Sequence, residues 1–195
     1  MPSYPLTLPT TVKPSAVDLR LRRTTSMTES PFTYAQQVHE HQGARWEMEI
    51  SFPPMTRAQA YEMQAFINSL RGRRGTFLAE ADPLAATNLG GGSNGTLNGA
   101  ASARATSIAT SGVGALIAGD FIQIGTGSDA HLHQVVTGGT NTFEIEPALR
   151  SDYIDGTTVT VNAPKGLWRL SSDDIGWNIA VSSLYGFTIP CIEAI

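Results

Sequence analysis

The sequence predicts a mainly β protein with one main helix, an α+β fold in which a split β-sandwich or barrel domain carries a small inserted all-β barrel. Three observations lead to this fold class. Apolar and polar residues alternate along several short segments, as they do in half-buried strands. One segment has its apolar residues at helical spacing. The middle of the chain contains short strand candidates separated by glycine turns, a pattern typical of small barrels.

The segment from Arg45 to Asp82 has the most regular pattern. Four large apolar residues alternate with polar ones and therefore share one buried face of a strand: Trp46, Met48, Ile50 and Phe52. Pro53-Pro54 ends this strand, because proline cannot donate to a β ladder. A helix is predicted to begin at Thr56, where Gln59 completes a capping box. Its apolar stripe comprises Ala60, Met63, Phe66, Ile67 and Leu70.

The sequence of the N-terminal part predicts an extended N-terminal segment followed by two strands. Four prolines favour an extended arm over residues 1–14, without a folded element. Alternation over 17–22 predicts a first strand, the polar stretch 23–31 a loop, and residues 32–38 a second strand. Gln42-Gly43 is expected to turn the chain into the strong strand that follows.

The composition changes abruptly from residue 85 to residue 114, where Ala, Gly, Ser, Thr and Asn dominate. Such a tract cannot form a core by itself, and it indicates a linker, a loop or a set of weak strands. The short strands predicted in the middle of the chain cover residues 103–110, 120–124, 131–136, 142–145 and 157–161.

Large residues return near the C-terminus, with strands predicted over 167–170, 177–181 and 185–189. The two ends of the chain resemble each other more than either resembles the middle. We therefore expect residues 1–86 and 165–195 to form one discontinuous domain, with residues 87–164 inserted in a loop.

Composition sets limits on function. The charged fraction is 15%, below the usual quarter or so, which is compatible both with a surface largely covered by partners and with a β-rich soluble monomer. A net charge of −4 argues against nucleic acid as the principal ligand. Residues 1–80 hold nine Lys/Arg and seven Asp/Glu (+2), and residues 81–195 hold four and ten (−6). This asymmetry favours head-to-tail neighbours at short range.

The sequence predicts an aqueous, reducing compartment. Cys191 is the only cysteine and lies beside Ile189 and Ile192, so it is expected to be a small buried hydrophobic residue. The N-terminus lacks the charged and apolar regions of a signal peptide. No segment reaches the roughly 18 apolar residues that a membrane-spanning helix needs.

Two histidine pairs are the first candidates for chemistry. His39 and His41, like His131 and His133, would share one face of a strand and form half of a metal site. Zinc needs three or four ligands, and no further cluster supplies them. Since both pairs lie among polar residues, we expect exposed histidines and no metal site.

The acidic and glycine-rich segments give no catalytic motif. Asp173-Asp174 and the pair Asp152 and Asp155 suggest calcium or paired carboxylates, but the calcium-loop spacing is absent and Asp beside Gly is typical of turns. The glycine run 90–95 lacks the Lys-Ser/Thr of a phosphate loop. We therefore expect a protein that is not an enzyme, with no catalytic, cofactor-binding or metal-binding residues and no cofactor.

Five arginines are the candidate interface residues. Arg71, Arg73 and Arg74 follow the predicted helix, where they would either complement its dipole or contact an acidic patch on a neighbouring subunit. Arg20 and Arg22 lie on the first strand, where they would belong to a solvated face or to the rim of an interface. The sequence leaves both alternatives open.

Several strings of residues resemble those of a known family. They are Trp46-Glu47-Met48-Glu49-Ile50, the helix through 66–70, the segments 72–77 and 82–83, and the later segments 119–125, 146–150 and 164–170. Together they resemble the distal tail proteins of long-tailed bacteriophages and the related gene-transfer-agent tail components. The resemblance covers roughly residues 17–195, and its motifs are structural.

This resemblance implies a structural protein of the virion that is assembled in the bacterial host cytoplasm. The subunits would form a homohexameric ring that joins the tail tube protein to the hub or baseplate proteins, with DNA only as passing cargo and no membrane span. The inserted barrel would project outward toward tail fibres. The alternative function is a carbohydrate-binding or fibre-attachment module of the tail tip, using exposed aromatics such as Tyr153 or Trp168.

Overall fold

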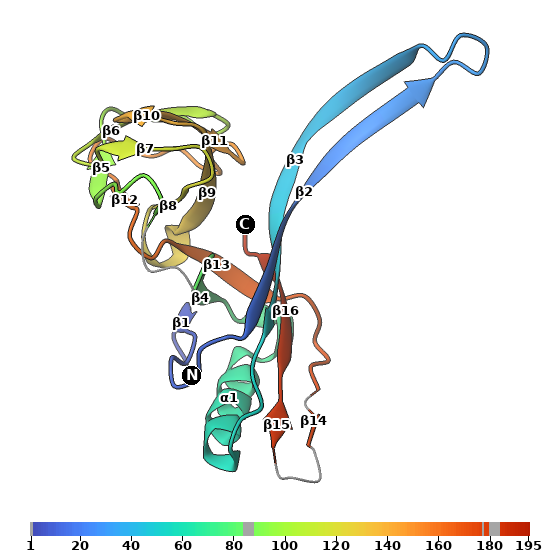
Figure 1. Ribbon diagram of the computed structural model, residues 1–195, viewed down its shortest axis with the longest axis vertical. Coiled ribbons are helices and arrows are strands. Elements are labelled where there is room, and N and C mark those ends of the chain that lie inside the picture. The colour runs from blue at the N-terminus through green and yellow to red at the C-terminus, as the bar shows by residue number, and fades with distance from the viewer. Residues whose placement is uncertain (1, 84–87, 177, 180–183) are drawn as a thin grey trace.

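The computed structural model describes residues 2–83, 88–176, 178–179 and 184–195. It combines a six-stranded sheet, covered by the helix α1 (Arg57–Leu70), with a closed six-stranded barrel (Figure 1). The strands of the sheet come from both ends of the chain, and those of the barrel from residues 95–160. The predicted fold class is therefore confirmed: the protein is mainly β, with one main helix and a small barrel.

The sheet is completed only when the chain returns from the barrel. Its strands in spatial order are β1 (Leu6–Thr7), β4 (Phe77–Glu80), β13 (Lys165–Leu170), β16 (Thr188–Glu193), β3 (Gln36–Ser51) and β2 (Ala16–Glu29). β1 and β4 are parallel, and the other neighbours are antiparallel. Trp168 of β13 pairs with Phe77 on one side and Glu193 on the other, so the C-terminal strands join two N-terminal parts of the sheet.

Helix α1 forms as the sequence predicts. The side-chain Oε1 of Gln59 accepts a hydrogen bond from the backbone N of Thr56 at 3.0 Å, which satisfies a donor at the helix start. The whole predicted apolar stripe is buried: Ala60, Met63, Phe66, Ile67 and Leu70. Arg71 adopts a left-handed conformation with φ 54° and ends the helix, and the short 3-10 helix η1 (Gly72–Arg74) follows.

The barrel has its own apolar core. Its strands in order are β11 (Thr142–Glu146), β6 (Ser107–Ser111), β5 (Gly95–Leu97), β12 (Thr158–Thr160), β8 (Phe121–Ile124) and β9 (His131–Thr137). The ribbon of β7 (Ala115–Leu116) and β10 (Gly139–Thr140) and the 3-10 helix η2 (Gly127–Asp129) complete it. The Gly/Ala-rich tract therefore contributes strands. A Cβ at Gly95 would lie 2.3 Å from the carbonyl oxygen of Ser111, so this close pairing needs glycine.

The predicted loop over residues 23–31 is wrong. β2 continues to Glu29, the chain turns over residues 30–35, and β3 begins at Gln36, so the strand predicted from Phe32 starts too early. Gln42-Gly43 is not a turn but lies inside β3, where the register shifts as in a β-bulge. Both faces of this ribbon are solvated, so the alternation that reveals a half-buried strand is absent.

The N-terminal segment is part of the fold. Leu6–Thr7 pairs with β4, and the side-chain hydroxyl of Tyr4 donates to the carbonyl oxygen of Ser69 at 2.8 Å. Leu8 and Val12 pack against the core of the sheet. The expectation that residues 1–14 contain no folded element is therefore wrong, because the apolar residues between the prolines anchor the segment.

Two sequence predictions fall partly outside the described residues. Of the strand predicted over 177–181, Trp177 and Val181 lie outside them, whereas β14 (Asn178–Ile179) pairs with β15 (Tyr185–Gly186). The predicted boundary at residues 86/87 also lies outside and stays a prediction. In the parts of the chain that the structure describes, no helix is both long and apolar enough to cross a bilayer.

Candidate functional site

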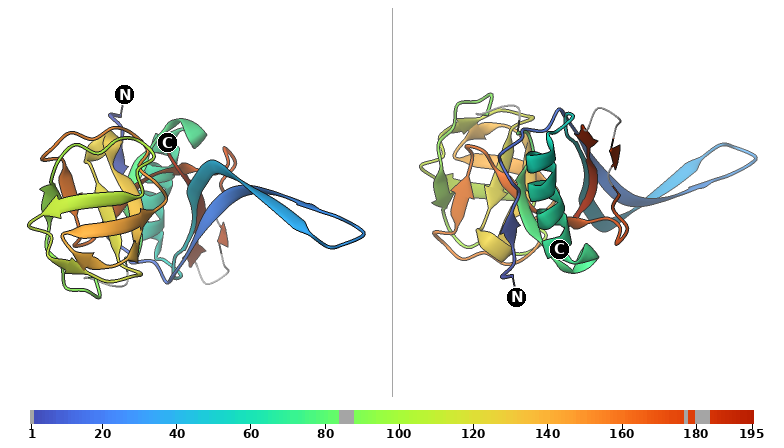
Figure 2. Two further views of the ribbon diagram at one scale, coloured as in Figure 1. Left: turned by 90° about the horizontal axis from the view of Figure 1, so that it is seen from above. Right: turned by 90° about the horizontal axis from the view of Figure 1, so that it is seen from below.

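A two-stranded arm is the most prominent surface feature. Beyond the pair Arg22 and Arg45, β2 and β3 leave the sheet and continue together into solvent, away from the barrel (Figures 1 and 2). We call residues 24–41 the arm and residues 29–35 its tip. All residues from Arg22 to Gly43 are exposed except the half-buried Ser30. The arm is held by cross-strand pairs from Thr24–His41 to Glu29–Gln36, and not by a core.

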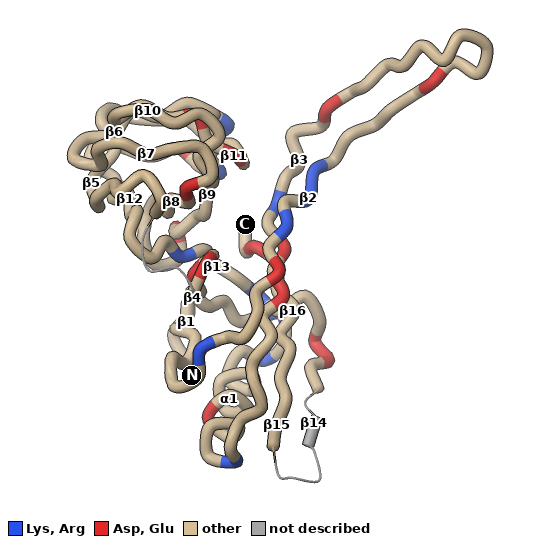
Figure 3. The backbone as a smooth tube through the Cα atoms, in the orientation of Figure 1, with Lys and Arg blue, Asp and Glu red and all other residues tan. Residues whose placement is uncertain are grey.

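The arm presents apolar side chains to solvent. Phe32 and Tyr34 at the tip are 92% and 75% exposed, and Met27 and Val38, which pair across the strands, are each 62% exposed. Between Thr24 and His39, Glu29 is the only residue with a formal charge at neutral pH, and the distal ribbon is accordingly almost free of charge colour in Figure 3. Exposed large apolar residues that gather on one protruding element are typical of a contact surface.

The base of the arm is fixed to the barrel. Arg23 forms an ion pair with Glu146 of β11 at 3.2 Å and a second one with Glu40 of β3 at 3.5 Å. The register shift between Arg23 and Thr24 lies at the same level. A β-bulge bends and twists a ribbon locally, so the bulge and the ion pairs together set the direction of the arm.

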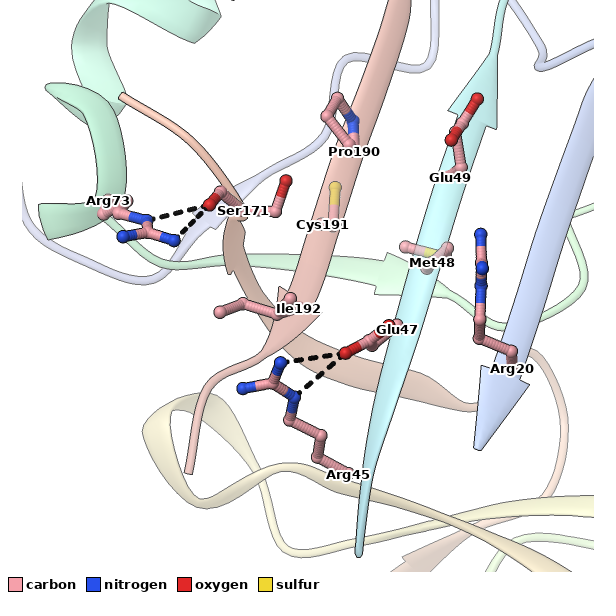
Figure 4. Close-up of a pocket in the computed structure, with 10 residues that line it drawn as sticks. All are labelled: Arg20, Arg45, Glu47, Met48, Glu49, Arg73, Ser171, Pro190, Cys191 and Ile192. Carbon is pink, nitrogen blue, oxygen red and sulfur yellow. Dashed lines mark hydrogen bonds and ion pairs between the residues drawn. The ribbon is translucent and has the colours of Figure 1, made fainter. Parts of the chain in front are cut away.

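The candidate interface arginines fall into two groups. Arg20 and Arg22 lie on the exposed face of β2, where Arg22 is 3.4 Å from Glu47, which also binds Arg45 at 2.8 Å. Figure 4 shows Arg20, Arg45 and Arg73 lining one pocket. Arg20 has no ion-pair partner among the residues that the structure describes.

The second group comprises the three arginines that follow helix α1, and one of them is hydrogen-bonded within its own chain. The side-chain Nε of Arg73 donates to the carbonyl oxygen of Ser171 at 2.8 Å, and its backbone N donates to Asp173 Oδ1 at 2.7 Å. Arg71 and Arg74 are exposed and lack an ion pair to any described residue. A contact between any of these arginines and a neighbouring subunit stays a prediction.

A buried polar junction joins the sheet to the barrel. At the end of β16, the carboxylate of Glu193 accepts a hydrogen bond from the backbone N of Trp46 at 2.9 Å. It also accepts two from the guanidinium of Arg150, at 3.1 and 2.5 Å. Trp46 Nε1 donates to the carbonyl oxygen of Leu132 in β9 at 3.0 Å, and its ring packs edge-on against Phe121 of β8. Sequence reasoning missed this junction.

The junction also contains histidines that were expected to be exposed. His133 is fully buried, and His131 is buried with its Nδ1 4.0 Å from Glu193 Oε1, so that expectation is wrong for this pair. Burial raises the pKa of Glu193, although Arg150 and the Trp46 backbone lower it in part. Burial, reinforced by the charge of Arg150, lowers the pKa of His131. His131 therefore faces Glu193 as a neutral ring.

His133 makes stability depend on pH. Burial lowers its pKa to about 3, well below the 6.5 of a histidine in an unfolded chain, while its Nδ1 lies 2.6 Å from the carbonyl oxygen of Pro147. The unfolded chain therefore binds a proton between these two values that the folded chain does not. From pH 7 to pH 5, this residue is expected to lower the free energy of unfolding by about 2 kcal/mol.

Urea denaturation at both pH values measures this loss. His133→Gln should reduce the pH dependence by about the same amount, because Gln does not titrate. His41→Gln, the same substitution at an exposed position of the arm, provides the matched control. Equal pH profiles for wild type and His133→Gln would contradict the assignment.

The remaining candidates of the sequence analysis have structural roles. Cys191 is buried as predicted, and burial raises the pKa of its thiol. Asp152 and Asp155 accept hydrogen bonds from loop backbone N–H groups, each at 2.7 Å. His39 and His41 are exposed, as expected. In the described part of the chain, no three His, Cys, Asp or Glu side chains gather into a group that could hold a metal ion.

The aromatic residues suggested for sugar binding are not available to a ligand. Trp168 is 0% and Tyr153 6% exposed, so the prediction of exposed stacking platforms is wrong. Trp168 lies in the central strand β13 and fills the core of the sheet, and Tyr153, which forms an isolated bridge with Ala101, packs in the core of the barrel. Neither a protein-family model nor a curated protein matches the chain. The functional conclusion therefore depends on the arm and on the resemblance in sequence.

Proposed function

We propose that this protein is a structural subunit of a bacteriophage tail, where copies of it assemble into a ring between the tail tube and the hub or baseplate. The observation that carries the proposal is the arm. A two-stranded ribbon is marginally stable in water by itself, and this one exposes Phe32, Tyr34, Met27 and Val38. An element of this kind gains stability when a partner covers it.

A ring of identical subunits needs two different surfaces that fit each other, one on each side of the subunit. A projecting arm supplies one of them, because it extends beyond the body of its own chain (Figure 2). The ion pair of Arg23 with Glu146 fixes the base of the arm, so less conformational entropy is lost on docking. The sixfold stoichiometry, the place in the tail and the outward position of the barrel are inferred from the resemblance in sequence.

The free energy gained by burying the apolar side chains of the arm is comparable to the cost of association. Full burial of Met27, Phe32 and Val38 contributes at most about 1.5–3 kcal/mol for each side chain. Association costs about 4–15 kcal/mol in lost freedom of motion. The arm can therefore offset much of this cost, and surfaces of the sheet contribute the rest. In this proposal, Arg20 and Arg22 on the exposed strand face belong to such a surface.

Shortening the arm tests the proposal. Thr25 and Glu40 are paired, so an Asn-Gly turn in place of residues 26–39 closes the hairpin with a favoured two-residue loop. We expect wild-type protein to form rings in electron micrographs and a matching mass by light scattering. The shortened variant should be monomeric with an unchanged melting temperature, because the deleted residues bury almost nothing.

The matched control changes an equally exposed apolar residue on the barrel. Ile154 is 78% exposed, and Ile154→Ser should leave the rings intact. A wild-type protein that stays monomeric at every concentration contradicts the proposed function. Normal rings from the shortened variant contradict the role of the arm.

A further inference from the structure

An apolar groove lies at the start of β2, where the N-terminal segment crosses the sheet. Its wall is formed by Leu8, Pro9, Val12, Pro14, Val17 and Leu78, and its volume is about 370 Å³. This size is within the range of pockets that take a small apolar group. Thr10, which is exposed, lies at its edge.

The rim of the groove carries positive charge. Lys13 is exposed and forms no ion pair with any residue in the described ranges. Lys165, on the other side, is 4.0 Å from Glu80. The tip of the arm has the complementary character, because it combines the exposed Phe32 and Tyr34 with a single acidic residue, Glu29.

The arm cannot reach the groove of its own chain. Val17 lines the groove and Glu29 begins the tip, and both belong to the continuous strand β2. Twelve residues separate them, which corresponds to about 40 Å of extended strand. Figure 1 shows the N-terminal segment beside β4 and α1 in the body of the molecule, well away from the tip of the arm. Contact between the two therefore requires two molecules.

We propose that the tip of the arm of one copy docks in the N-terminal groove of the next copy. The aromatic rings of Phe32 and Tyr34 enter the apolar groove, and Glu29 lies near Lys13 at the rim. Each copy then offers one tip and one groove, the pair of unlike surfaces that a closed ring needs. This inference rests on the proposed function and specifies which surfaces meet.

Two variants, each of which lacks one of the two docking surfaces, test this proposal. The shortened arm, with Asn-Gly for residues 26–39, keeps the groove and lacks the tip. Thr10→Trp keeps the arm and fills the groove from its exposed edge. Circular dichroism first establishes that both variants are folded. Each variant alone should be monomeric, whereas an equimolar mixture at millimolar protein should give a one-to-one complex of about twice the 20.8 kDa monomer mass.

The outcomes separate this inference from the proposed function. Rings in the wild type, together with a mixture that stays monomeric, overturn docking in the groove and leave ring assembly intact. Normal rings from Thr10→Trp overturn it as well. A wild type without rings, together with a mixture that forms the complex, overturns the ring and keeps the contact between tip and groove.

Discussion

Arg150→Met is expected to lower the free energy of unfolding by about 3–5 kcal/mol, because it leaves a buried carboxylate without its cation. The side chain of Glu193 is 2% exposed, and both of its oxygens accept hydrogen bonds from Arg150. In the variant, loss of the Arg150 charge and hydrogen bonds would raise the pKa of Glu193 further. Chemical denaturation at pH 7 measures the loss. Arg104 is exposed, so the control substitution Arg104→Met should change the free energy of unfolding by less than about 0.5 kcal/mol.

The pH dependence and a second substitution identify the cause. A carboxyl group whose pKa is raised by folding is fully penalised above its pKa in the folded protein and not at all below its pKa in the unfolded chain, so the deficit of Arg150→Met should shrink as the pH falls from the first value to the second. Adding Glu193→Gln removes the unpaired charge and should recover part of the lost stability, since a neutral side chain is cheaper to bury. Equal losses in the single and double variants would contradict this explanation.

Trp168→Ala is expected to lower the free energy of unfolding by about 3–5 kcal/mol through the cavity it leaves. Trp168 is fully buried in a central strand, between its cross-strand neighbours Phe77 and Glu193. Its Nε1 donates to the carbonyl oxygen of Ala79 at 3.1 Å, so it also ties β13 to β4. Thermal unfolding and urea titration measure the loss.

Trp168→Phe separates packing from hydrogen bonding. It keeps an aromatic ring but leaves the Ala79 carbonyl without this donor, which costs about 1–3 kcal/mol. Ile154→Ala, an exposed truncation on the barrel, should be close to neutral. A Trp168→Ala variant as stable as wild type would show that the core collapses around the missing ring.

The sequence was sufficient to predict the elements that are buried on one side, because one-sided burial gives their apolar residues a regular spacing. The alternation of Trp46, Met48 and Ile50 and the helical stripe from Ala60 to Leu70 each report a one-sided apolar face, and both elements form as predicted. Turn glycines between short apolar runs similarly indicated the barrel. Apolar spacing and turn glycines are local features of the sequence, so they can be recognised without knowing which strands pair.

The arm gave no comparable signal. From Thr24 to His41 both faces of the ribbon meet solvent, so its few apolar side chains do not alternate with polar ones and the pattern resembles that of a loop. Its strands exist because β2 and β3 are already aligned in the sheet and continue to pair. The five arginines were found from charge alone, and the sequence could not show that Arg73 is bonded to Ser171 and Asp173 of its own chain.

By itself the sequence determined the α+β class, the helix, the buried faces of the main strands and the resemblance that suggests a tail protein. The tertiary structure decided that Glu193 meets Arg150 and Trp46, residues 43 and 147 positions away. It also decided that residues 24–41 project as an arm and that the N-terminal segment forms a groove. The reason is physical: periodicity records which side of one element is buried, whereas these features depend on which distant elements meet.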